Sequence, residues 1–182
     1  TASFSSSVFD VGNGTYEGLS NRVNVSGTGS RLAVDERINL GATEDLNSIM
    51  TVSSNAVVET GYLSMGGASD KLRMNKGIVA VEGDYVDTYN SLEDGHIQLQ
   101  DEQSESWVTI STLTESERAA LGWEINYYSD DASAADAGYE GYGGYTVMNS
   151  GGVIPEPGAS LLIGSGILLF VAYRRIHKVF RF

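Results

Sequence analysis

Short runs in which apolar and polar residues alternate recur through the first half of the chain. Three of these runs open with Val23/Val25, Met50/Val52 and Leu72/Met74. Alternation with a period of two residues indicates a strand with one buried face. Val52 follows Val25 by 27 positions and Met74 follows Val52 by 22 positions. The pattern of strands therefore repeats as a unit.

Two further sets of apolar positions lie inside the same units. They are Leu32/Val34, Val58 and Val79/Val81, and then Ile38/Leu40 and Leu63/Met65, followed by Gly41 and Gly66. A repeat of about 20–30 residues that contains two or three short strands is typical of a solenoid. One coil cannot bury its inward side chains alone, whereas stacked coils share a continuous core.

These repeats predict a mainly β ectodomain over residues 1–129. For the repeats themselves, at about 21–95, we expect a short right-handed parallel β-helix. An antiparallel β-sandwich or jelly roll is the alternative, because its strands also recur about every 8–12 residues with turn signals between them.

Residues 96–129 follow a different pattern. The segments that alternate like strands are HIQLQ at 96–100, WVTIST at 107–112 and WEINYYSD at 123–130. Between the last two, Thr114 and Glu117 have the spacing of a capping box, which indicates a helix beginning there. Gly122 can supply the left-handed residue that ends this helix. We expect this strand–helix–strand piece to cap the open end of the solenoid.

Residues 130–152 are rich in Gly, Tyr and Asp, and we interpret them as a flexible or edge-packed linker. Tyr139, Tyr142 and Tyr145 follow one another at intervals of three positions. Our hypothesis for these three rings is contact with the sugar rings of an extracellular polysaccharide.

The last part of the chain holds both of its prolines, Pro155 and Pro157, on either side of Glu156. Proline fixes its own φ and biases the preceding residue towards extended geometry. We therefore expect a stiff extended tripeptide with one exposed carboxylate. Residues 159–173 then follow without a charge, and as a helix they would span about 22 Å.

That length makes the apolar run a marginal match to a hydrocarbon core of about 30 Å. We predict one transmembrane helix at about 158–173 and a basic tail at 174–182. A buried core helix is the alternative, but a core helix of a small domain normally keeps a polar stripe, and this run has none.

The charges are divided unevenly along the chain. All 24 acidic residues lie at or before Glu156, against seven Lys/Arg upstream of the apolar run, whereas the last nine residues carry four Lys/Arg and no acid. An acidic body disfavours nucleic acid as a partner, and a basic flank suits the cytoplasmic end of a membrane span. The absence of cysteine excludes disulfides and thiolate metal sites.

The order Pro155-Glu156-Pro157, then an apolar helix, then Arg174-Arg175 resembles the PEP-CTERM sorting signal of Gram-negative bacteria. The resemblance covers residues 153–182. It implies an exported protein that is held in the inner membrane by its tail and cut near the motif by an exosortase, a membrane-embedded cysteine protease. The body would then reach the cell surface or the extracellular matrix.

The same resemblance assigns roles to individual residues. It implies that Pro155, Glu156 and Pro157 are recognised by the exosortase and that Arg174 and Arg175 set the orientation in the bilayer. The segment after the arginines, IHKVFRF, is longer and more apolar than the usual basic ending. At the other end, TASFSSS resembles a mature terminus left by a signal peptidase, and the repeats resemble the Gly/Val-rich β-solenoids of bacterial surface proteins.

Candidate chemistry in the body is sparse, and we expect no enzyme. His96 is interpreted as a surface histidine near a strand start, and no G-x-S-x-G motif occurs. The acidic groups that could offer oxygen ligands to Ca²⁺ are Glu82/Asp84/Asp87, Glu93/Asp94 and Asp101/Glu102/Glu105. Solvated surface carboxylates are the simpler interpretation of these groups.

We therefore expect a structural or adhesive protein of the cell surface or matrix, with the lipid bilayer and an exosortase as partners. The alternative is a carbohydrate- or calcium-binding, lectin-like surface module. A polysaccharide-acting β-helix enzyme is the third hypothesis, and the scattering of seven basic residues over the body speaks against it.

Overall fold

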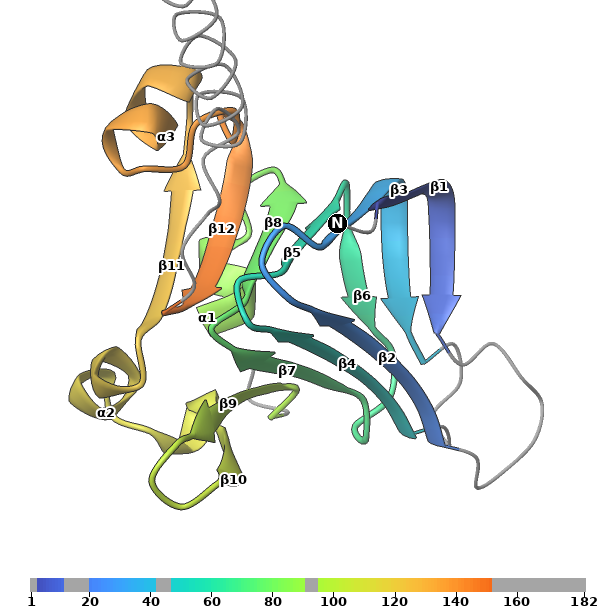
Figure 1. Cartoon of the computed structure of the whole chain (residues 1–182), viewed down its shortest axis with the longest axis vertical. Helices are drawn as coiled ribbons and strands as arrows, with labels where there is room; N and C mark the ends of the chain where they lie inside the picture. The colour runs from blue at the N-terminus through green and yellow to red at the C-terminus, as the bar shows by residue number, and fades with distance from the viewer. Residues whose placement is uncertain (1–2, 12–19, 42–46, 91–94, 152–182) are drawn as a thin grey trace, which may run out of the picture.

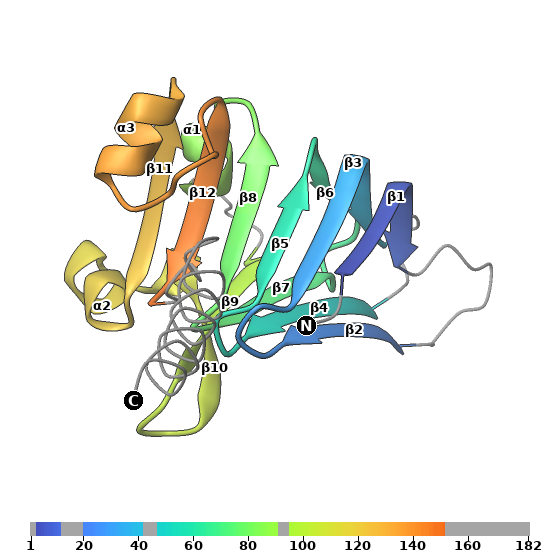
Figure 2. The same cartoon turned by 45° about the horizontal axis from the view of Figure 1, so that its top comes forward.

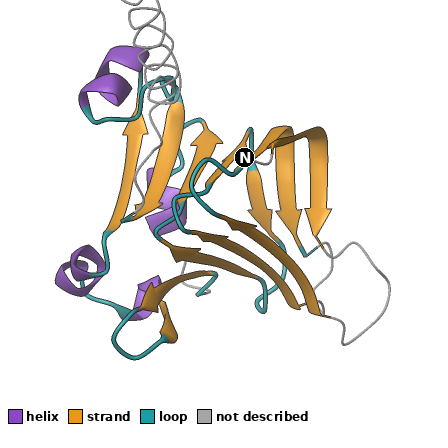
Figure 3. Ribbon diagram, in the orientation of Figure 1, coloured by secondary structure: helices purple, strands orange, loops and turns teal. Residues whose placement is uncertain are grey.

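The computed structural model describes residues 3–11, 20–41, 47–90 and 95–151. Strands dominate this part of the chain, as Figure 3 shows, so the prediction of a mainly β fold is confirmed. The strands form two sheets, one of seven strands and one of five. Figures 1 and 2 show the two sheets as separate layers with the chain running back and forth between them.

The seven-stranded sheet has the order β1-β3-β5-β8-β12-β11, with β6 paired to β3. Its members are β1 (Ser3–Val11), β3 (Arg31–Leu40), β5 (Val57–Thr60), β6 (Leu63–Met65), β8 (Ile78–Glu82), β12 (Tyr145–Ser150) and β11 (Trp123–Tyr128). The five-stranded sheet has the order β10-β9-β7-β4-β2. Its members are β10 (Ser106–Thr109), β9 (Ile97–Asp101), β7 (Lys71–Asn75), β4 (Asn47–Ser53) and β2 (Ser20–Ser26).

Up to β5, successive strands alternate between the sheets instead of forming hairpins, whereas β6 follows β5 in the same sheet and β9 and β10 form a hairpin. Strands β1, β3, β5 and β8 pair in parallel in one sheet, and β2, β4, β7 and β9 pair in parallel in the other. Antiparallel pairs join β9 to β10, β8 to β12 and β12 to β11. The alternative prediction of an antiparallel sandwich is therefore wrong for strands β1 to β9. Strands joined by tight hairpins pair antiparallel, whereas parallel pairs need longer crossover connections.

The register of these pairs is the one that the repeats predict. Val25 lies opposite Val52, and Val52 lies opposite Met74. In the other sheet, Leu32 lies opposite Val58. Equivalent apolar positions of successive units therefore stack on one another, which is how inward side chains of short strands become buried.

In the seven-stranded sheet, a bend at Gly61 interrupts the chain that pairs with β3. The first half of β3 pairs with β5 and its second half with β6, and Gly61 stands between β5 and β6. A Cβ atom at Gly61 would lie 2.6 Å from the carbonyl oxygen of Glu36 and 2.7 Å from that of Asp35. Glycine is therefore required here because two stretches of backbone approach too closely for a side chain.

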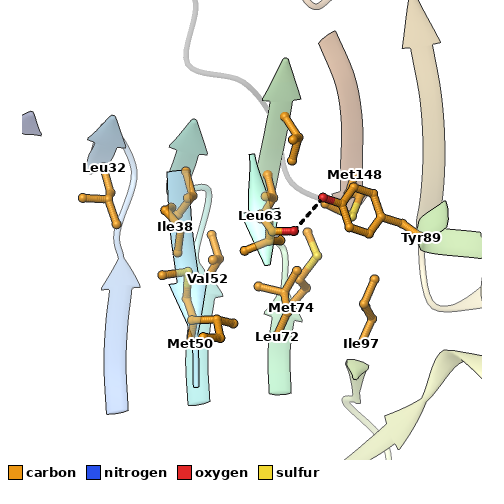
Figure 4. Packing of buried hydrophobic residues seen from close by; sticks show 14 of the residues in the cluster. Leu32, Ile38, Met50, Val52, Leu63, Leu72, Met74, Tyr89, Ile97 and Met148 are labelled. Carbon is orange, nitrogen blue, oxygen red and sulfur yellow. Dashed lines mark hydrogen bonds between the residues drawn. The ribbon is translucent and has the colours of Figure 1, made fainter. Parts of the chain in front are cut away.

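The space between the sheets is filled by aliphatic and methionine side chains. Figure 4 labels several of them together with Tyr89, and Met50, Leu72, Met74 and Ile97 from the five-stranded sheet are fully buried there. Tyr89, in helix α1 (Val86–Asn90), donates a hydrogen bond of 3.1 Å from its hydroxyl to the carbonyl oxygen of Leu63. Burial raises the pKa of Tyr89, so this phenol stays neutral in the core.

A buried carboxylate holds one corner of the fold. Asp70 is fully buried, and its two carboxylate oxygens accept hydrogen bonds from the backbone nitrogens of Ser48 at 3.0 Å and Gly67 at 2.6 Å. Its own carbonyl oxygen lies 2.9 Å from the Nδ1 atom of His96. Asp70 therefore joins the start of β4 to the segments before β7 and β9, where buried backbone groups would otherwise lack partners.

The predicted cap contains the expected helix. Helix α2 (Glu115–Ala120) begins at a complete capping box of Thr114 and Glu117 and precedes Gly122, whose φ is +73°. The hydrogen bonds from Thr114 lower the pKa of the Glu117 carboxyl. WVTIST, however, forms β10 followed by the short 3-10 helix η1 (Ile110–Thr112) in place of one strand.

The structure differs from the linker prediction for residues 130–152. Asp130 caps helix α3 (Asp131–Asp136), and residues 145–150 form β12, which lies between β8 and β11 in the large sheet. The reason is that β8 offers a second apolar face. Residues 78–81 are all buried, because a second cluster packs on the outside of the sheet. That cluster contains Val57, Ile78, Ala80, Tyr128, Ala134, Tyr139, Tyr142 and Val147.

The described ranges contain no helix with the length and apolar character needed to cross a bilayer. The predicted transmembrane helix at about 158–173 lies outside the described residues.

Candidate functional site on the outward face of the five-stranded sheet

Alternate side chains of the five-stranded sheet point away from the core, and the register places them in rows. The rows are Asn24–Thr51–Arg73–Gln98–Thr109, Ser26–Ser53–Asn75–Gln100–Trp107 and Arg22–Ile49–Lys71. We call the surface made by these three rows the polar face, although Ile49, which lies between Arg22 and Lys71 in the register, is apolar and buried. Each row runs across the strands, whose spacing is about 4.8 Å.

Side chains within the rows are joined by hydrogen bonds. Arg73 donates from Nε to Gln98 Oε1 at 2.9 Å, and Asn75 donates from Nδ2 to Gln100 Oε1. Ser53 donates to Ser26 at 3.0 Å. These contacts fix the orientation of the amide and guanidinium groups before any partner arrives.

One aromatic ring completes the polar face at its β10 edge. The guanidinium carbon of Arg73 lies 5.2 Å from the centre of the Trp107 ring, within the range of a cation–π contact. Both side chains are half-buried. Partial burial and, after it, the positive charge of Arg22 lower the pKa of Arg73.

The polar face is positive in a molecule that is otherwise acidic. Three of the seven Lys/Arg upstream of residue 153 lie in its rows, namely Arg22, Lys71 and Arg73, and none of the row positions is Asp or Glu. Among the described residues neither Arg22 nor Arg73 forms an ion pair, whereas Arg31 is paired with Glu59 and Lys76 with Glu102. Lys71 donates to the carbonyl oxygen of Ala68 at 2.9 Å.

A cavity of about 330 Å³ lies beside the end of the second row. Asn75 and Gln100 line it, together with Lys76, Asp101 and Glu102. Met74, Ala120 and Leu121 also line it, so the polar face borders a hollow whose lining is partly apolar and includes two acids.

The structure places the three predicted tyrosines away from the polar face. Tyr139 and Tyr142 are both 7% exposed and belong to the outer cluster on the large sheet, and Tyr145 is half-buried beside them. The hydroxyl of Tyr139 accepts a hydrogen bond of 2.7 Å from Asn149, and burial raises the pKa of Tyr142 to about 12. The rings of Tyr139 and Tyr142 are core groups and not an open platform for sugars.

Two other expectations concern chemistry in the body. His96 is buried with 5% exposure, so its interpretation as a surface residue is wrong, and it serves the corner around Asp70. The described residues contain no group of three or more His, Cys, Asp or Glu able to hold a metal ion. Of the acidic groups considered for Ca²⁺, Glu93 and Asp94 lie outside the described residues.

The sorting motif Pro155, Glu156, Pro157 and the basic pair Arg174, Arg175 also lie outside the described residues. Comparisons with protein-family models, with curated proteins and with solved structures found no match to this chain.

Proposed function

We propose that this chain is an exported, non-enzymatic protein with a structural or adhesive role at the cell surface or in the extracellular matrix. In this proposal a PEP-CTERM signal anchors it in the inner membrane and an exosortase processes it. One observation carries the proposal. Pro155-Glu156-Pro157 stands directly before the uncharged run at 159–173, and Arg174-Arg175 follow it directly.

Each part of that order has a physical use in a sorting signal. The two prolines hold the backbone extended, which is the form in which a protease binds its substrate, and they keep helix out of the cleavage region. The apolar run sets the depth of the tripeptide relative to the bilayer. The arginines keep the far end of the helix in the cytoplasm.

We further propose that the body is a short β-solenoid. The alternation of parallel strands between two sheets supports this proposal. The bend at Gly61 supports it too, because β6 then forms a third, short side of the coil. A stack of coils is a stiff and extendable shape. Such a shape suits a scaffold outside the cell better than an enzyme that must close around a substrate.

The second candidate function is that of a carbohydrate-binding surface module. The polar face favours it, because fixed amide, hydroxyl and guanidinium groups next to a half-buried indole are suited to a polar polymer. The metal-binding form of this alternative, with Ca²⁺, lacks comparable support among the described residues.

The sorting proposal can be tested with the double variant Pro155→Ala/Pro157→Ala, expressed in a bacterium that contains an exosortase. We expect the variant to stay in the inner membrane at its uncut mass, because the tripeptide can then join the helix that follows. The matched control is Ser160→Ala/Ser165→Ala, which alters the apolar run and leaves the motif intact. Normal cutting and normal location of the proline variant would contradict the proposal.

A further inference from the structure

We propose that the polar face binds an anionic polysaccharide, a polymer of sugar units that bear carboxylate or sulfate groups. Arg22, Lys71 and Arg73 would hold the acid groups, and the amide side chains of the neighbouring rows would bond the hydroxyls. The inference names the class of ligand for the carbohydrate-binding function proposed above. It rests on the proposed function only for the location, outside the cell, where the protein would meet the polymer.

Charge complementarity is the first argument for this occupant. The chain upstream of residue 153 carries many more acids than bases, so a polyanion is repelled by most of its surface. On the polar face the sign is reversed, since Arg22 and Arg73 lie on the same side of the sheet, two strands apart, and neither forms an ion pair among the described residues. A guanidinium can hold a carboxylate or sulfate through two parallel hydrogen bonds.

The repetition of the rows is the second argument. Similar polar groups recur from strand to strand at about 4.8 Å, a spacing close to the rise of one pyranose unit in an extended polymer. A periodic ligand that crosses the strands can therefore meet a hydroxyl, amide or guanidinium group on each strand of the first row. The hydrogen bond between Arg73 and Gln98 and the bond between Asn75 and Gln100 fix these groups in advance, and this reduces the entropy lost on binding.

The composition of the polar face distinguishes a polysaccharide from a nucleic acid. Proteins that bind single-stranded nucleic acids stack successive bases on several aromatic rings, whereas Trp107 is the one aromatic residue in the three rows. Hydroxyl-bonding groups are abundant by contrast, with Asn24, Asn75, Gln98 and Gln100 among the row positions. Sugar hydroxyls are the natural partners of such amides.

The test is calorimetric titration of the full chain in detergent with three polymers: polygalacturonate, neutral dextran and single-stranded poly-dT. We expect saturable binding of polygalacturonate that weakens as salt is raised. Arg73→Gln should reduce the affinity by about tenfold or more, because it removes a charged partner of the acid groups. Arg22→Gln, at an exposed position, should act in the same direction.

The matched control is Arg37→Gln, which removes the same charge from an exposed position on β3 in the other sheet and should leave the affinity unchanged. Circular dichroism of each variant checks folding, and Arg22→Gln keeps the test usable if Arg73→Gln unfolds the protein. Three results would overturn the inference: no saturable binding of polygalacturonate, equal binding of dextran, or tighter binding of poly-dT. Because export and cutting are measured separately in cells, failure here leaves the sorting proposal untouched, and the reverse also holds.

Discussion

At the scale of single residues, the most consequential group is the buried carboxylate of Asp70. It has no exposed surface, and its two oxygens bond the backbone nitrogens of Ser48 and Gly67. A buried charge is tolerated when such donors surround it. The side chain thus joins the start of β4 to the turn before β7, and nothing in its local sequence, between Ser69 and Lys71, distinguishes it from the exposed acids.

We expect Asp70→Ala to lower the free energy of unfolding by about 3 kcal/mol, because two buried N–H groups lose their acceptor. Asp70→Asn keeps one acceptor oxygen and should cost less. The exposed Asp35→Ala should change stability by no more than about 0.5 kcal/mol. Urea unfolding of the three variants measures these values, and equal stability of Asp70→Ala and Asp35→Ala would show that the corner does not depend on this carboxylate.

At the scale of elements, the strands of the repeats could be predicted from the sequence and β12 could not. The alignment of Val25, Val52 and Met74 could be predicted, because each belongs to a local pattern of alternating residues that recurs at a nearly constant interval. The apolar residues of β12, Val147 and Met148, are few and stand among glycines. Their burial depends on pairing with β8, which lies more than sixty positions earlier in the chain. No local sequence pattern indicates such a partner.

The polar face was missed for a related reason. Alignment of the repeats by their apolar positions leaves the intervening positions unexamined, yet the same register places Arg73 beside Gln98. Trp107 belongs to the polar face through β10, an antiparallel strand that lies beyond the repeats. Comparing the outward positions of successive units is the signal that could have found most of these residues.

Substitution of Met148 tests whether β12 is part of the core. Met148 is fully buried between the sheets, so Met148→Ala should cost about 2–5 kcal/mol through lost burial and a new cavity. Met65→Ala is the matched control, because Met65 is half-buried on the short strand β6, and its cost should stay below about 1.5 kcal/mol. Thermal or urea unfolding of both variants measures the two losses of stability. Equal, small losses would mean that residues 145–150 are a dispensable extension.

At the scale of the whole molecule, we propose different tasks for the described body and for the tail. The body presents stacked strands with a positive face on an otherwise acidic molecule, whereas the sequence of the tail holds Pro155-Glu156-Pro157, an apolar run and a basic end. This division suits the proposal of a module that works outside the cell and a signal that delivers it there. The mainly β body could be predicted from the sequence, since its repeats are local, while the proposed destination rests on the order of residues in the tail.

The most direct test of this account is the mass of the C-terminal peptide of the protein recovered from the surface of the cells that make it. The account predicts a terminus near Pro157, with the apolar run of residues 159–173 removed. Recovery of surface protein in which every copy still carries that run would contradict it, because the tail would then be a permanent anchor and not a signal for cutting.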